Sequence, residues 1–113
     1  MDEGVEIPDI RFWGLVVHPG KPAKYTIDNE HGLLELCHLT NVALVSKSKS
    51  PEPIYIRVKA PEDDVEYTLG ALVPGRTYSF CTDLMITPDT VFSHSGSPGD
   101  QVHLTGYRCD APA

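Results

Sequence analysis

The spacing of prolines and glycines is the feature that most constrains how this chain can fold. Ten prolines and nine glycines are spread along 113 residues, and they lie between short apolar runs instead of in a single tract. Proline fixes φ and removes a backbone donor, while glycine permits tight turns, so these residues end one short element after another. The pattern is typical of an all-β chain with many turns.

Between these turns the side chains alternate as they do in strands. Residues 54–59 place isoleucine and valine on one face and tyrosine, arginine and lysine on the other, which is the pattern of a sheet with one solvated face. A polar turn separates them from a second alternating run at 65–72, which predicts a hairpin. We count about seven or eight strands at intervals of about eight to twelve residues, the signal of a sandwich or barrel. The other runs are 11–17, 23–27, 33–45, 78–87, 91–95 and 101–107.

The run at 33–45 is also compatible with a helix. We favour a strand because β-branched residues, His38 and Asn41 interrupt the helical stripe, and no capping residue precedes it. As a strand it is expected to place two sets of side chains on opposite faces. The first set is Leu34, Leu36, Val42 and Leu44, and the second is Glu35, Cys37, Leu39 and Asn41.

The first apolar run contains the only tryptophan. If Trp13 is buried it removes a large apolar area from water, so it is expected to anchor a core. Gly14 beside it would allow a ring or another backbone to come close. The run ends at a turn of two prolines and a glycine at 18–22.

Length and charge exclude several classes of protein. The chain is long enough for one domain, and its net charge of −7 argues against direct nucleic-acid binding, because phosphates would be repelled. Basic proteins are the partners that this charge favours. Three cysteines without a Cys-x-x-Cys pair, and the lack of a secretory or membrane-spanning segment, predict an intracellular, reduced, soluble domain with no membrane partner.

Three segments occur in an order that is similar to a known family. They are Phe12-Trp13-Gly14 with Pro19-Gly20-Lys21-Pro22, then Leu69-Gly70-Ala71-Leu72, and finally 92–95 through Val102-His103-Leu104-Thr105-Gly106-Tyr107. Together they resemble the nucleoplasmin-like domain found at the N-terminus of nuclear FKBP-type peptidyl-prolyl isomerases and of plant-type histone-deacetylase-like nucleolar proteins. The resemblance implies an eight-stranded jelly-roll β-sandwich that forms a pentameric ring, or two rings face to face as a decamer, and acts as a histone chaperone in the nucleus or nucleolus.

The resemblance also suggests a division of the chain. We expect a flexible acidic N-terminal arm at 1–10, a nucleoplasmin-like core at 11–108 and a C-terminal tail at 109–113 that is a truncation point or linker. Family members usually begin within a residue or two of the Phe-Trp-Gly motif, whereas eleven residues precede Phe12 here. The long acidic tracts and the isomerase or zinc-finger parts of the family are absent, so the chain is either a fragment of a longer protein or a lone core domain.

Assembly and histone binding are each expected to use particular residues. A sandwich leaves unpaired edge strands, and a ring covers them while multiplying the negative charge of each protomer. Outward apolar residues are expected to supply the contact, namely Tyr55, Tyr67, Leu39 and Met85, and the core or oligomer anchors are Phe12, Trp13, Gly14 and Tyr107. The histone-binding candidates are the acidic residues Glu62, Asp63, Asp64, Glu66, Asp2, Glu3, Glu6 and Asp9.

Two other interpretations remain. In one, the chain is a structural module that oligomerises a larger nuclear protein, such as an FKBP-type isomerase, and absent acidic tails bind histones. In the other, it is an amide hydrolase with His31 or His38 as a base and Asp28 beside it, but no metal-ligand set or pocket for that chemistry is evident. We therefore predict no enzyme activity and no cofactor.

Histidine, cysteine and serine positions complete the site predictions. Cys37 and His38 are adjacent and would point to opposite faces, and His94 and His103 could meet across a hairpin without a third ligand, so no metal site is predicted. The serines and lysines of 46–50 form a solvated loop or a phosphorylation site that would add negative charge.

Overall fold

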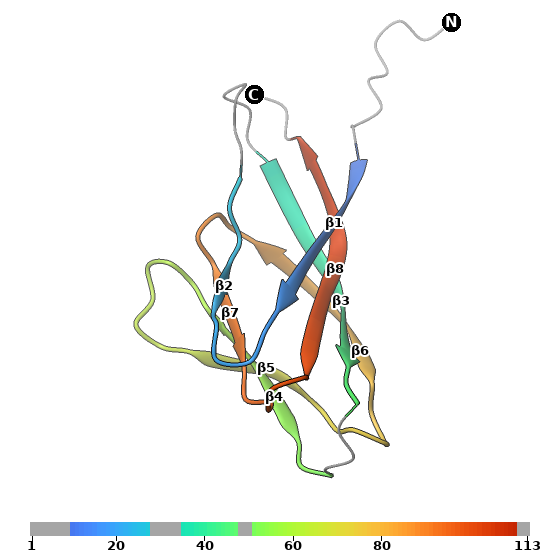
Figure 1. Cartoon of the computed structure of the whole chain (residues 1–113). Helices are drawn as coiled ribbons and strands as arrows, with labels where there is room; N and C mark the ends of the chain where they lie inside the picture. The colour runs from blue at the N-terminus through green and yellow to red at the C-terminus, as the bar shows by residue number, and fades with distance from the viewer. Residues whose placement is uncertain (1–9, 28–34, 48–50, 111–113) are drawn as a thin grey trace, which may run out of the picture.

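The computed structural model describes residues 10–27, 35–47 and 51–110, and these residues form an all-β domain (Figure 1). They contain eight strands and no helix. The prediction of an all-β fold with eight strands is therefore confirmed. The strands are β1 (Ile10–Val17), β2 (Ala23–Lys24), β3 (Glu35–Val45), β4 (Ile54–Lys59), β5 (Tyr67–Leu72), β6 (Ser79–Ile86), β7 (Val91–His94) and β8 (Gln101–Asp110).

The strands form two antiparallel sheets that face each other across the core (Figure 1). The first sheet has the order β1-β8-β3-β6 and the second has the order β2-β7-β4-β5. Apart from the β4–β5 hairpin, strands that are consecutive in the chain are not neighbours in a sheet. Two four-stranded sheets with this exchange of strands form a jelly roll, as the resemblance to the nucleoplasmin-like domain implied.

Strand β3 changes its inward face at a β-bulge between Leu39 and Asn41. Before the bulge Cys37 and Leu39 are buried, and after it Val42 and Leu44 are buried. The expected division of this run into two constant faces is therefore wrong, because the extra residue of the bulge shifts the alternation by one. Leu39 was expected to point outward and is instead fully buried.

The core lies between the two sheets. Trp13 is 6 % exposed and its ring lies edge-on to that of Tyr25, with 5.5 Å between the ring centroids. Aromatic, aliphatic and thiol side chains from both sheets surround this pair. The fully buried members include Val17, Cys37, Leu39, Val42, Ile56, Leu72, Phe92, Val102 and Leu104.

Gly106 is required where β8 passes the bulge of β3. A Cβ at this position would overlap the backbone carbonyl oxygen of His38. Because that carbonyl belongs to the neighbouring strand, it cannot move aside as the end of a flexible side chain could. The close approach of the two backbones therefore depends on this glycine.

Candidate assembly face and acidic groove

The outward surface of the first sheet carries almost no charge. It consists of the side chains of β1, β8, β3 and β6 that alternate with the core residues, and we call it the neutral face. Among the side chains that the structure describes on this face, Asp83 is the one acidic residue and none is a lysine or arginine. Seven exposed large apolar side chains lie on it: Ile10, Phe12, Val16, Leu36, Val45, Met85 and Tyr107.

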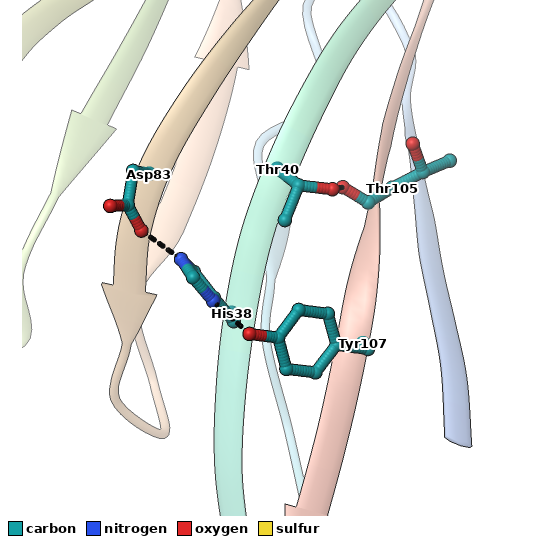
Figure 2. Close-up of polar contacts among 5 residues, drawn as sticks. All are labelled: His38, Thr40, Asp83, Thr105 and Tyr107. Atoms are coloured by element: carbon teal, nitrogen blue, oxygen red, sulfur yellow. Dashed lines mark hydrogen bonds and ion pairs between the residues drawn. The ribbon is translucent and has the colours of Figure 1, made fainter. Parts of the chain in front are cut away.

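A polar network crosses three strands of the neutral face (Figure 2). The His38 ring forms an ion pair or hydrogen bond with Asp83 through Nε2, and its Nδ1 lies 2.6 Å from the Tyr107 hydroxyl. Because a carboxylate only accepts hydrogen bonds, Nε2 donates to Asp83, and the hydroxyl donates to Nδ1 when the imidazole is neutral. The rings of His38 and Tyr107 also lie edge-on, with 5.0 Å between their centroids.

The same view shows how the bulge beside this network is held. Thr40, the extra residue of β3, directs its hydroxyl toward β8 and donates a hydrogen bond of 3.3 Å to the Thr105 carbonyl oxygen (Figure 2). This bond gives the Thr105 carbonyl oxygen a donor at the point where the bulge interrupts the backbone hydrogen bonds between β3 and β8.

The predicted anchor residues occupy different environments. Trp13 is in the core, whereas Phe12 is 75 % exposed and lies on the neutral face with Tyr107. The Phe12 ring covers Gly14, where a Cβ would lie 3.4 Å from the Phe12 Cε1 atom. A ring does lie beside Gly14, but the contact distance is ordinary, so its approach does not require a glycine. The role of Phe12 and Tyr107 in assembly stays a prediction.

The outward surface of the second sheet, which we call the charged face, has a different composition. Lys24, Arg57 and Lys59 lie on it, and the exposed Tyr55 is beside them on β4. Glu66 reaches this surface and accepts a hydrogen bond of 3.3 Å from the Ser93 hydroxyl. The charged face therefore combines three cations, one carboxylate and an aromatic side chain.

The acidic residues predicted between 62 and 66 lie in the connection from β4 to β5. Glu62, Asp64 and Glu66 are exposed. Asp63 is less exposed, because its backbone N–H bonds to the Ala60 carbonyl oxygen and its carboxylate accepts a bond of 3.0 Å from the Val65 N–H. The other acidic candidates, Asp2, Glu3, Glu6 and Asp9, lie outside the described residues.

A groove of about 410 Å³ separates this connection from the turn between β6 and β7. Ala60, Pro61 and Pro88 contribute apolar walls, and Glu62 and Asp89 supply a carboxylate from each side. Sequence reasoning did not include Asp89 in the acidic site, because it marked only the end of a strand. Its φ of 70° is in the left-handed region, which aspartate tolerates better than most residues.

The histidines and cysteines that invited a metal interpretation are dispersed. His94 belongs to the second sheet and His103 to the first, so β7 and β8 do not form the hairpin across which these two histidines could have met. Cys37 is buried, and burial raises the pKa of its thiol to about 11, while His38 faces outward from the same strand. Among the described residues, no group of three or more potential ligands could hold a metal ion. Asp28 and His31 lie outside those residues, as do positions 48–50 of the serine-rich loop.

His94 instead links the two sheets. Its Nε2 lies 3.0 Å from the Val17 carbonyl oxygen, and its Nδ1 accepts a bond of 3.0 Å from the Gly96 N–H. Burial lowers the pKa of His94, although the bond to Val17 and the nearby Asp100 carboxylate act in the opposite direction. The neutral ring with its proton on Nε2 satisfies both contacts.

These features define an antiparallel jelly-roll domain with one nearly uncharged outer face. The family model of the nucleoplasmin-like domain matches residues 12–109, so the chain belongs to the nucleoplasmin-like domain family. The resemblance seen in the sequence is confirmed.

The curated relatives include two plant groups of proteins. The chain is 30 % identical over 104 residues to histone deacetylase HDT3 of Zea mays, covering 91 % of this chain and 32 % of the relative. It is 33 % identical over 97 residues to peptidyl-prolyl cis-trans isomerase FKBP53 of Arabidopsis thaliana, covering 85 % of this chain and 19 % of the relative. The chain thus spans a third or less of the length of these relatives.

Two solved structures from Drosophila share the fold. The NLP core, whose structure was reported for its insight into pentamer formation and histone binding, matches with a TM-score of 0.65 at 16 % identity, over 87 % of this chain and 97 % of that one. The nucleoplasmin-like N-terminal domain of FKBP39 also gives a TM-score of 0.65, at 21 % identity over 92 % and 93 %. Within the described part of our chain, no helix has the length and apolarity to cross a membrane.

Proposed function

We propose that this domain is the core of a nuclear histone chaperone, which assembles as a pentameric ring and binds core histones through its acidic loops. The observation that carries the proposal is the neutral face, because a protein with a net charge of −7 would not be expected to leave so many apolar side chains in water on a face with one carboxylate. Membership of the family and the reported pentamer of the Drosophila NLP core support the ring. A decamer of two rings is the larger form of the same proposal.

Histone binding follows from charge and shape together. Five copies of an acidic protomer create a strong negative field that attracts basic proteins and repels nucleic acid. The groove between Glu62 and Asp89 fits the aliphatic stem of a lysine or arginine against prolines, with its cationic head near both carboxylates. No cofactor and no catalytic residue have a part in this mechanism, and we propose that the domain is not an enzyme.

Two measurements on the purified chain test the proposal. Light scattering during gel filtration should give the mass of five or ten copies, and immobilised core histones should retain the complex in low salt and release it as salt rises. A monomer at micromolar concentration would contradict the ring. An intact ring that does not bind histones would contradict the chaperone function.

A matched pair of variants tests the groove. The double variant Glu62→Gln with Asp89→Asn should weaken histone binding and reduce its salt dependence. Glu52→Gln with Asp64→Asn removes the same charge without touching the groove walls, and should have a smaller effect. Equal losses in both variants would show that net charge acts alone.

The alternative function is that of a structural module, and one observation favours it. The relatives are much longer than this chain, so further parts of a parent protein would have room for acidic histone-binding segments. In that case the domain serves to oligomerise an attached protein, and its ring would form normally. Histone retention by this chain alone distinguishes the two functions.

A further inference from the structure

The neutral face carries seven of the eleven exposed large hydrophobic side chains among the described residues, and none of the described residues covers these seven. We infer that it packs against the charged face of a second copy of this chain, and that Asp83, held by His38, sets the register of the contact by pairing with a cation of that copy. The inference rests on the assembly proposed above. It adds which two surfaces meet and which polar group orients them.

The distribution of charge points to a second copy. With a net charge of −7, two copies repel each other over most of their surfaces. Contact between the neutral face, with Asp83 as its described carboxylate, and the charged face, where Lys24, Arg57 and Lys59 outnumber Glu66, reduces this repulsion. A ring requires such a contact, because its interfaces join two different surfaces of the same protomer.

Asp83 can orient the contact because the apolar side chains around it cannot. Apolar burial has no preferred direction, so many relative positions of two copies would bury similar areas. A buried carboxylate without a partner is costly, which disfavours every position that leaves Asp83 unpaired. Its side chain is 87 % exposed in the single chain, so a covering copy would remove it from water.

The network in Figure 2 keeps this carboxylate in one place. Oδ1 of Asp83 contacts His38, and Tyr107 contacts the other nitrogen of the same ring. The three side chains come from β6, β3 and β8, so the position of the carboxylate is tied to the sheet and not to one flexible side chain. This leaves Oδ2 to meet a donor from the second copy.

Arg57 is the cation best placed to be that donor. It lies in the middle of β4, which is an inner strand of the second sheet with β7 on one side and β5 on the other. Its guanidinium group is planar and offers several donors to a carboxylate, which makes the pairing directional. Lys59 is two residues further along β4, and Lys24 lies in the same row as Lys59, on the far side of β7.

The first experiment compares Asp83→Lys with Asp89→Lys by native mass spectrometry and sedimentation velocity. Both variants change the net charge equally, but Asp89 lies in the acidic groove and not on the neutral face. Asp83→Lys should dissociate at a concentration roughly tenfold or more above that of the parent chain, or give mixed stoichiometries. Asp89→Lys should assemble as the parent does. Circular dichroism and thermal melting show that each variant is folded.

The second experiment restores the charge pair. In the Asp83→Lys background, Arg57→Glu should recover the parent stoichiometry and most of its affinity, and Lys59→Glu and Lys24→Glu serve as separate comparisons. If Asp83→Lys behaves as Asp89→Lys does, or if none of the three reversals restores assembly, the inference is wrong. If the unsubstituted chain is itself monomeric, the assembly under Proposed function is wrong.

Discussion

The outward surfaces of the two sheets share a backbone arrangement but differ in their side chains. Among the described residues, the neutral face has seven exposed large apolar side chains and a single carboxylate, whereas the charged face carries Lys24, Arg57 and Lys59. Both sheets have four antiparallel strands, so strand geometry does not cause the difference. A surface that only met water would need no such division, because solvated sheet faces are usually polar.

This difference between the two faces explains how an acidic chain can associate with copies of itself. Several of its acidic side chains lie in the connections between strands, and two of them, Glu62 and Asp89, line a groove. The sheets are thereby free to form contacts with low repulsion, while the loops keep the charge that attracts basic partners. Assembly and partner binding can then use separate parts of one small domain.

The largest effect is expected from a change that destroys the sheet beneath the neutral face. Gly106→Ala would place a methyl group into the His38 carbonyl oxygen and should lower the free energy of unfolding by about 3 kcal/mol or more. Gly14→Ala is the control, since its methyl group meets the Phe12 ring at an ordinary contact distance. Urea unfolding of the two variants measures the difference, and similar stabilities would show that β3 and β8 are less tightly apposed than described.

The next largest effect is expected from a substitution on the neutral face that weakens assembly but leaves the domain folded. Phe12→Ser removes the most exposed aromatic side chain of the neutral face, and should weaken assembly by about tenfold or more, because aromatic side chains that become buried in an interface contribute strongly to binding. Thermal stability of the dissociated chain should stay nearly unchanged. The same measurement on Val65→Ser, which alters an exposed apolar residue in a connection, should show little effect on association.

How far the sequence could predict the two faces depends on the strand. In β4 the alternation is unbroken, and Ile54 and Ile56, which were predicted to share one face, are both buried; in β6, Met85 was predicted to point outward and is exposed. In β3 the bulge at Thr40 changes the inward set, and a single sequence does not show which residue is extra. Leu39 was predicted to point outward for this reason. The buried residues are odd-numbered before Thr40 (Cys37 and Leu39) and even-numbered after it (Val42 and Leu44), and such a change of parity is the sequence signal of a bulge.

The candidate site was predictable only where it was local. The acidic run at 62–66 is visible in the sequence, but its proximity to Asp89 depends on the packing of two connections that are distant in the chain. The same holds for His38, which lies 45 residues from Asp83 and 69 from Tyr107. Strand order brings these residues together, and strand order follows from the whole topology.

A smaller effect is expected on the pH dependence of folding stability, through His94, which links the two sheets. The pKa of His94 is lowered in the folded chain, so the neutral ring stabilises the fold above the pKa of the unfolded chain, about 6.5. This contribution is lost as the pH falls through the folded pKa, because a proton on Nδ1 would face the Gly96 N–H. His94→Asn should cost about 1 kcal/mol at pH 7.5 and reduce the loss of stability toward pH 5. Unfolding curves at both pH values check this, and an unchanged pH dependence would contradict it.

The smallest effect is a change in the reactivity of two thiols on either side of the first sheet. Cys81 is exposed on the neutral face, while Cys37 is buried beneath it with a pKa of about 11, so iodoacetamide at pH 8 should modify Cys81 and leave Cys37 unmodified in the folded chain. If the neutral face is covered by a second copy, the modification of Cys81 should slow a few-fold as protein concentration rises through the range of assembly. Peptide mass spectrometry measures both sites, and Cys37 provides the control for unfolding. Concentration-independent modification of Cys81 in an assembled sample would place the contact elsewhere on the domain, because a covered thiol cannot keep the rate of an exposed one.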